Sequence, residues 1–210
     1  MTKIRHKKTY VRVILLKNDI SNYHQDLKDE QDFTKKLRLF NNCFVALDIL
    51  RDSFSHFSLL IKNEAELIEK ARSLKKRLKF INHLRNRISG HFDEVVLEKA
   101  IQWEPQIFSQ ENRNNEEGKL LLIYKSLIES AINSYVDEKS KQKEFDTEID
   151  LFYPPDQKLF FNYIGEINTD AIAFLTVLEN LNNKQIEYWS RDKMFEMAIK
   201  AGETDFNLKE

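Results

Sequence analysis

The sequence is poor in the residues that interrupt secondary structure, with only four glycines and three prolines among 210 residues. Leucine, isoleucine, phenylalanine, lysine and glutamate are common instead, which favours helices over tight turns. The chain also lacks a P-loop, a glycine-rich nucleotide fingerprint, a CxxC pair and a serine nucleophile elbow. These features predict an all-α bundle of five to seven helices, forming a single domain over residues 1–210.

Cysteine and long apolar runs are scarce too. The single cysteine, Cys43, excludes an internal disulfide and is expected to be a core thiol in a reducing compartment. Charged residues interrupt every apolar run before it is long enough to span a membrane, so we expect a cytoplasmic protein with no membrane partner. The formal net charge is −1, so any affinity for nucleic acid must come from local patches.

Apolar residues at steps of three and four predict two long antiparallel helices joined near Asn63. The first covers about residues 32–62, and the second begins after Asn63, the expected N-cap. The inward-facing residues of the first are Phe40, Phe44, Leu47, Leu50, Phe54, Phe57 and Ile61. Those of the second are Leu67, Ala71, Leu74, Leu78, Ile81 and Leu84. Both stripes are typical of core packing.

The remaining segments are assigned by the same periodicity. The basic N-terminal segment, residues 1–16, contains a β-prone run at residues 10–16 that fits a strand or a helix start, with helix favoured. Further helices are expected at about residues 93–103 and 117–137, after Pro155, and at 184–201. Loops are expected at residues 105–117 and 138–155.

Two carboxylates and an imidazole recur at every fourth position of the first long helix. Asp48, Asp52 and His56 therefore lie on one face, where they can bind a metal or hold neighbouring site residues in place. No metal-ligand motif surrounds them, so an ion-paired or solvated face is favoured. We expect no metal and no cofactor.

Reactive side chains concentrate in residues 84–93, with the sequence LRNRISGHFD. The planar fork of arginine matches a phosphate, and histidine exchanges protons near neutrality. On one unbroken helix Arg85 and His91 project about 120° apart, whereas Arg87 and His91 share a face. If Gly90 ends the helix, Arg85 and His91 can converge. The alternative to a phosphate site is an ordinary helix C-terminus, where these cations only interact favourably with the helix macrodipole.

A basic surface precedes this motif. Lys75, Lys76 and Lys79 lie off the apolar stripe of the second long helix, which then reaches the two arginines. Such a run is often a solvated face. Because this run ends in an arginine and histidine motif, it is also a candidate path for a nucleic-acid backbone.

The motif resembles the signature of the HEPN superfamily (higher eukaryotes and prokaryotes nucleotide-binding domain). Arg85, Asn86 and His91 match its arginine, polar residue and histidine, and the form is similar to that of abortive-infection and toxin members. Arg87 stands where lysine is common, and Gly90 where alanine is common. The resemblance covers the motif and the general helical plan.

The resemblance implies a metal-independent endoribonuclease. His91 would handle the proton of a ribose 2′-hydroxyl, whose attack on phosphorus leaves a 2′,3′-cyclic phosphate. Arg85 would neutralise the phosphoryl charge, Asn86 would orient the pair or bind phosphate, and Arg87 would be a supporting contact. RNA is then the substrate, a homodimer shares the cleft, and a cognate antitoxin is a possible partner.

Two other interpretations fit the same residues. The chain can be a non-catalytic HEPN-like helical module that binds RNA, a nucleotide or a protein. It can also be a structural helical protein in which the motif only ends a helix.

Overall fold

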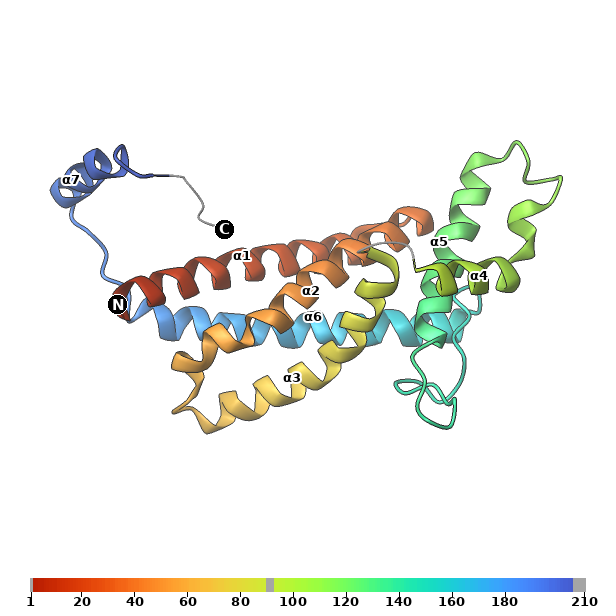
Figure 1. Ribbon diagram of the computed structural model, residues 1–210, viewed down its shortest axis with the longest axis horizontal. Helices are drawn as coiled ribbons and strands as arrows, with labels where there is room; N and C mark the ends of the chain where they lie inside the picture. Colours follow the sequence, from red (N-terminus) through yellow and green to blue (C-terminus); the bar gives the residue numbers. More distant parts are fainter. Residues whose placement is uncertain (1, 90–92, 206–210) are drawn as a thin grey trace.

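The computed structural model describes residues 2–89 and 93–205, and these residues are almost entirely helical (Figure 1). They contain no β-strand, and their one isolated bridge joins Val136 and Gln142. The predicted all-α fold is confirmed. The elements in chain order are α1 (Thr2–Asp29), α2 (Phe33–Ile61), α3 (Ala65–Leu84), the π-helical turn η1 (Arg85–Ser89), α4 (Glu94–Trp103), the 3-10 turn η2 (Pro105–Phe108), α5 (Glu116–Asn133), α6 (Pro154–Asn183) and α7 (Arg191–Ala201).

Helix α2 is the central element of the bundle. It contacts α1, α3, α5, α6 and η1, and it runs antiparallel to α3 in Figure 1. The turn between α2 and α3 lies near Asn63, as predicted. The predicted cap is wrong, because Glu64 is the N-cap residue of α3 and its side chain makes no capping hydrogen bond.

The core is rich in phenylalanine. The apolar stripe predicted for α2 is buried except for Ile61, which is partly buried, and its four phenylalanines are at most 7% exposed. Phe40 lies 5.4 Å from Phe160 of α6 between ring centroids, and other rings of α3 and α6 continue the cluster. Each such side chain contributes roughly 1.5–3 kcal/mol by leaving water. This packing fixes the positions of α2, α3 and α6.

The N-terminal segment is part of a longer helix than the sequence indicated. The preference for helix over strand at residues 10–16 is confirmed, but α1 continues to Asp29. Its buried apolar stripe is narrow, consisting of Val13, Leu16 and Ile20. Three inward residues among many charges give only a weak periodic signal, although they are enough to pack α1 against α2 and α6.

Helix α5 crosses one end of the bundle, and α4 packs beside it (Figure 1). The two helices share a small apolar cluster centred on Val96, Ala100 and Leu127. The predicted loop at 105–117 contains η2, and α5 begins at Glu116. Helix α5 ends at Asn133, earlier than predicted, because the Asn133 amide bonds both backbone groups of Ile149 and turns the chain into an irregular segment.

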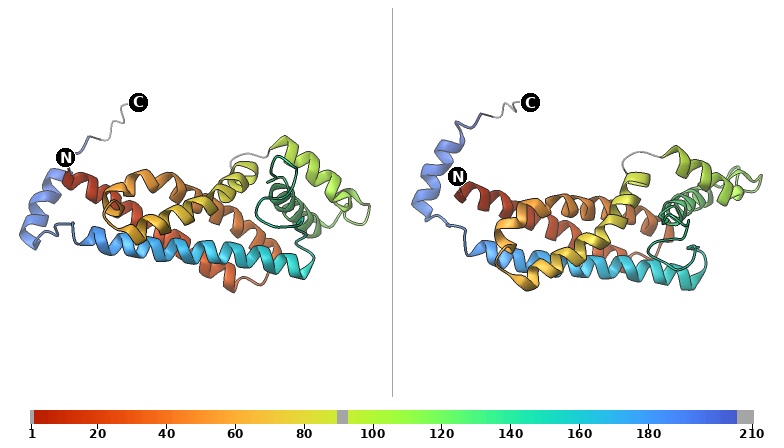
Figure 2. Two further views of the ribbon diagram at one scale, coloured as in Figure 1. Left: turned by 90° about the horizontal axis from the view of Figure 1, so that it is seen from below. Right: turned by 60° about the horizontal axis from the view of Figure 1, so that its bottom comes forward.

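Helix α7 lies at the other end of the bundle (Figure 2). It begins at Arg191 rather than near 184, because Ser190 caps it and Lys184 ends α6. Lys7 lies 4.1 Å from the Trp189 ring centroid, and this contact joins the preceding segment to α1. No helix in the described ranges is long and apolar enough to cross a bilayer.

Candidate phosphate site and a buried charge cluster

The two motif arginines lie on η1, the π-helical turn that continues α3. Ile88 is buried and anchors the turn, whereas the side chains of Arg85 and Arg87 are 40% and 38% exposed. A π-turn changes the direction of side chains relative to a regular helix, and such turns are frequent at functional sites. Here the turn presents two guanidinium groups at the surface.

Arg85 is oriented by a buried carboxylate. Its Nε lies 3.8 Å from Oδ2 of Asp48, whose side chain is only 9% exposed. Asp48 also accepts hydrogen bonds from Nε of Arg51 at 2.7 Å and Nδ2 of Asn82 at 3.1 Å. Nη1 of Arg85 donates to Oδ1 of Asn86 at 3.0 Å. No described residue bonds Nη2, so one edge of the guanidinium stays available to a ligand.

The acidic row on α2 is an ion-paired face, as favoured from the sequence. Asp48 has the contacts above, and Asp52 pairs with Nη2 of Arg51 at 2.8 Å. His56 takes part through its backbone carbonyl, which accepts from Thr9. Over the described ranges, no three metal-ligating side chains gather into a group. Of these three residues, Asp48 is the one that contacts Arg85.

Arg87 has a carboxylate of its own. It forms an ion pair with Asp93, whose other oxygen accepts from the Val96 N–H and caps α4. Partial burial opposes ionisation of Asp93, but the Val96 hydrogen bond and the Arg87 charge outweigh it and lower the pKa. Asp93 therefore stays charged at neutral pH and joins η1 to the start of α4.

The third catalytic candidate, His91, lies outside the described residues, as does Gly90. It therefore stays untested whether Arg85 and His91 project apart on an unbroken helix or converge after a helix end at Gly90. The three candidate substrate-binding lysines are described. Lys75, Lys76 and Lys79 are exposed on α3, and none of them pairs with a carboxylate in the described part of the chain. By contrast, Arg77 pairs with Asp170 at 2.6 Å.

His83 connects the motif helix to α5, a role that sequence reasoning missed. Its Nε2 lies 3.0 Å from both the Ala131 carbonyl oxygen and Oγ of Ser134. Burial lowers the pKa of His83, and the nearby Arg87 charge acts in the same direction. The imidazole is uncharged at neutral pH. No local pattern distinguishes it from an exposed histidine.

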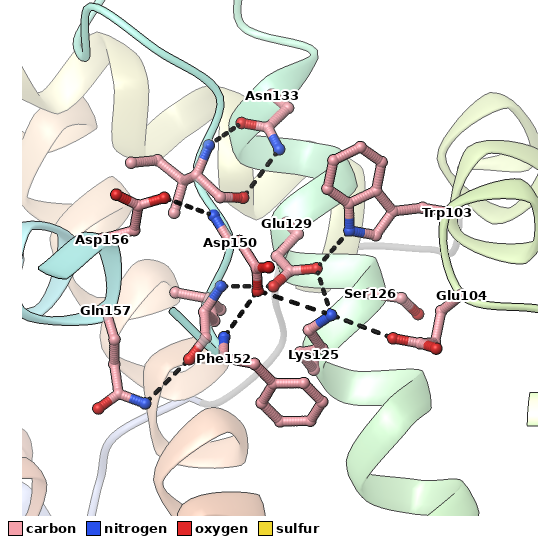
Figure 3. Close-up of polar contacts among 12 residues, drawn as sticks. Trp103, Glu104, Lys125, Ser126, Glu129, Asn133, Asp150, Phe152, Asp156 and Gln157 are labelled. Atoms are coloured by element: carbon pink, nitrogen blue, oxygen red, sulfur yellow. Dashed lines mark hydrogen bonds and ion pairs between the residues drawn. The ribbon is translucent and has the colours of Figure 1, made fainter. Parts of the chain in front are cut away.

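A second polar cluster, centred on Lys125, is buried where α4, α5 and the segment before α6 meet (Figure 3). Nζ of Lys125 lies 3.0 Å from Glu104, 3.2 Å from Glu129 and 3.9 Å from Asp150. Its side chain is 6% exposed. The only feature of the sequence that indicates this cluster is the i, i+4 spacing of Lys125 and Glu129. Ion pairs on the surface of a helix have the same spacing.

Glu129 is the fully buried member of this cluster. It accepts from Nε1 of Trp103 at 2.7 Å and from the Leu151 backbone N–H. Burial raises the pKa of Glu129 to about 7 despite these donors. Burial opposes the charge of Lys125, but Glu129 and Glu104 outweigh it and raise the Lys125 pKa. Glu129 is enclosed, so it positions Trp103 instead of meeting a substrate.

The prediction that Cys43 is a core thiol is confirmed. The residue is buried, and its thiol donates to Oδ1 of Asn168 at 3.3 Å. Burial raises the pKa of Cys43 to about 12, so the thiolate is not formed at neutral pH.

Compared with known protein families, curated protein sequences and solved structures, the chain matches none of them. The function is therefore inferred from the residues of the site itself.

Proposed function

We propose that the protein is a metal-independent endoribonuclease of the toxin or antiviral-defence kind, with Arg85, Asn86 and His91 as its catalytic residues. The observation that supports this most is the pair of guanidinium groups on one π-turn, Arg85 paired with Asp48 and Arg87 with Asp93. Cations that are already oriented stabilise developing charge without reorganising during the reaction.

The free edge of Arg85 suits the non-bridging oxygens of a phosphodiester. In the proposed reaction His91 takes the proton of the 2′-hydroxyl, the 2′-oxygen forms a bond to phosphorus, and the bond to the 5′-oxygen breaks. The leaving oxygen takes up a proton, which gives a 2′,3′-cyclic phosphate and a 5′-hydroxyl end. Arg85 neutralises the negative charge that develops, and Asn86 orients Arg85 through their hydrogen bond.

The basic face of α3 supports RNA as the substrate. Lys75, Lys76 and Lys79 have free ammonium groups along the helix that leads to η1, and such groups bind phosphates without regard to sequence. A two-fold homodimer is part of the proposal, because one exposed helix end supplies only half of the polar groups that a phosphate site needs. An antitoxin would act by covering this face.

Lysine substitutions in the motif test the proposal. Purified protein is incubated with mixed RNA in EDTA, and the initial rates of cleavage are compared. Arg85→Lys keeps the charge but loses the fork, so the rate should fall by about 100-fold. Arg87→Lys should be milder, because a lysine still pairs with Asp93. Equal activity of Arg85→Lys and the parent protein would contradict the assignment.

A second candidate is a non-catalytic RNA-binding module. The observation that favours it is the exposure of Lys75, Lys76 and Lys79, because their ammonium groups can bind phosphates without any catalytic residue. Salt-dependent RNA binding with no cleavage in EDTA would select this candidate.

A further inference from the structure

A hollow of about 250 Å³ lies where α4 meets the end of α5. Drug-sized ligand sites are typically about 300–1,000 Å³, so this hollow suits one planar ring system. Its lining includes a tryptophan, two amides, an ammonium group, two hydroxyl groups and a carboxylate. The lining residues are Lys99, Gln102, Trp103, Ser130, Asn133, Ser134 and Glu148.

Trp103 gives the hollow a fixed aromatic wall. The residue is 43% exposed, yet its Nε1 donates to the buried Glu129 carboxylate at 2.7 Å (Figure 3). Lys125 in turn holds Glu129 at 3.2 Å. The indole is therefore anchored at its polar edge while part of the ring remains open. An anchored ring loses little conformational freedom when a base stacks on it.

The polar groups of the hollow divide into used and available ones. Both amide atoms of Asn133 bond the backbone of Ile149, so this side chain cannot bind a ligand. Gln102 and Lys99 are exposed, and no described residue pairs with either side chain. An amide can both donate to and accept from the edge of a base, and an ammonium group binds phosphate.

One side-chain contact links the wall of the hollow to the helix that carries the candidate phosphate site. Ser134 lines it, and the Ser134 Oγ lies 3.0 Å from Nε2 of His83 on α3. Arg87 follows His83 by four residues, or about one helical turn. The hollow and η1 thus both lie against α5, since α4 and η1 each contact that helix.

We propose that this hollow is a nucleobase subsite, in which one unpaired base of the RNA stacks on Trp103 and bonds the Gln102 amide. The inference rests on the proposed function, since it names the part of the substrate that the same site recognises. Lys99 contacts a phosphate next to that base. The subsite selects single-stranded RNA, because a paired base cannot leave its stack without cost.

The chain contains two tryptophans, which makes a direct test possible. Trp189→Phe leaves Trp103 as the only indole, and Trp103→Phe leaves Trp189, at the far end of the bundle, as a matched control. Each variant is titrated with a 2′-O-methyl RNA oligonucleotide, which cannot be cleaved by 2′-oxygen attack. Fluorescence should be quenched in Trp189→Phe and unchanged in Trp103→Phe. Binding without any change in Trp103 emission would overturn the subsite.

An affinity measurement accompanies the titration. Trp103→Leu should bind a labelled oligonucleotide about 10-fold more weakly in an anisotropy titration, whereas Trp103→Phe, which retains a ring, should lose less. Thermal unfolding of both variants checks that the loss of the Glu129 hydrogen bond leaves the fold intact. Equal affinities for the leucine and phenylalanine variants would contradict stacking.

The outcomes separate the subsite from the nuclease. Cleavage of unmodified RNA by Trp189→Phe in EDTA, with no quenching of Trp103, overturns the subsite and leaves the proposed function standing. Quenching without cleavage supports the subsite and contradicts the nuclease. A protein that neither binds nor cleaves RNA overturns both.

Discussion

The two arginines of the π-turn are held in unequal surroundings. Asp48 is 9% exposed and has two further donors, whereas Asp93 is 21% exposed and also caps a helix. Removing Asp48 would therefore take from Arg85 its carboxylate partner and from Asn82 its acceptor, although Arg51 would keep its ion pair with Asp52. This difference explains why Arg85 is the better candidate for a fixed phosphate contact and Arg87 for a supporting one.

At the same scale, Glu129 is expected to make stability depend on pH. Its pKa is about 7 in the folded protein and near 4.5 for an ordinary glutamate, so the folded state holds an extra proton between these values. The free energy of unfolding should then fall as pH rises from 4.5 to 7, by up to about 1.4 kcal/mol per pH unit. Glu129→Gln should lack this component in urea denaturation at pH 5, 6 and 7.

The matched control for this prediction is Glu117→Gln, an exposed residue on the same helix. It should keep the pH dependence of the parent protein. A Glu129→Gln protein with the parent slope would show that the proton is not held at this position.

The chemical types in the motif could be read from the sequence, but their partners could not. Arg85, Asn86 and Arg87 stand out because few other segments combine such groups. The pairing of Arg85 with Asp48 was one of the options for the acidic row, since a helix face is readable from spacing. Lys125 and Glu129 were missed because the i, i+4 spacing of an ion pair does not reveal whether the pair is buried.

At the scale of elements, the long helices were predictable and the π-turn was not. Helix α2 has a regular apolar stripe, and its bounds differ from the expected 32–62 by one residue at each end. The winding of η1 depends on Ile88 being held in the core formed with α2 and α5, which is a tertiary effect. The end of α5 and the start of α7 also differ from the prediction. They are set by the hydrogen bonds of Asn133 and by the Ser190 cap, and the spacing of apolar residues does not report such contacts.

The basic face of α3 leads to a prediction about RNA binding. Alanine at Lys75, Lys76 and Lys79 together should weaken binding and reduce the slope of log affinity against log salt by about 2–3, because each lost phosphate contact reduces the slope by roughly 0.7–0.9. The control variant has alanine at Lys139, Lys158 and Lys184, which are exposed and lie outside α3, so it loses the same charge. If both triple variants behave alike, the face of α3 has no special role.

Helix α6 contains a glycine that leaves room for a side chain. A Cβ added at Gly165 meets no atom within 4 Å, and the position lies in the helix interior. Gly165→Ala should therefore raise the free energy of unfolding by about 0.5–1 kcal/mol through helix propensity. Thermal and urea unfolding measure the change. A lower stability would indicate that the neighbouring space is closed or already filled.

At the scale of the whole molecule, the bundle is a rigid support for a site at one end. Helices α1, α2, α3 and α6 make up the long body of the bundle (Figure 1), and α4 and η1, the turn that contains the two arginines, both contact α5. The all-helical class followed from composition and periodicity. The placement of α1 could not be predicted in this way, because its buried apolar stripe consists of only three residues.

The proposed site also requires a homodimer. We expect light scattering to give twice the monomer mass of 25.1 kDa at micromolar concentrations. Specific RNA cleavage activity should fall on dilution below the dissociation constant, since half a site lacks the convergent groups. A monomer that keeps full specific activity at every concentration would contradict the shared cleft.

The chemical ends of the RNA products distinguish attack by the 2′-oxygen from other routes of cleavage. Purified protein in EDTA should cut RNA to give 2′,3′-cyclic phosphate and 5′-hydroxyl ends, and it should leave a 2′-O-methyl RNA intact, because the attacking oxygen is then blocked. His91→Ala should abolish this cleavage at every pH. Products with 3′-hydroxyl and 5′-phosphate ends, or undiminished cleavage by His91→Ala, would contradict the account.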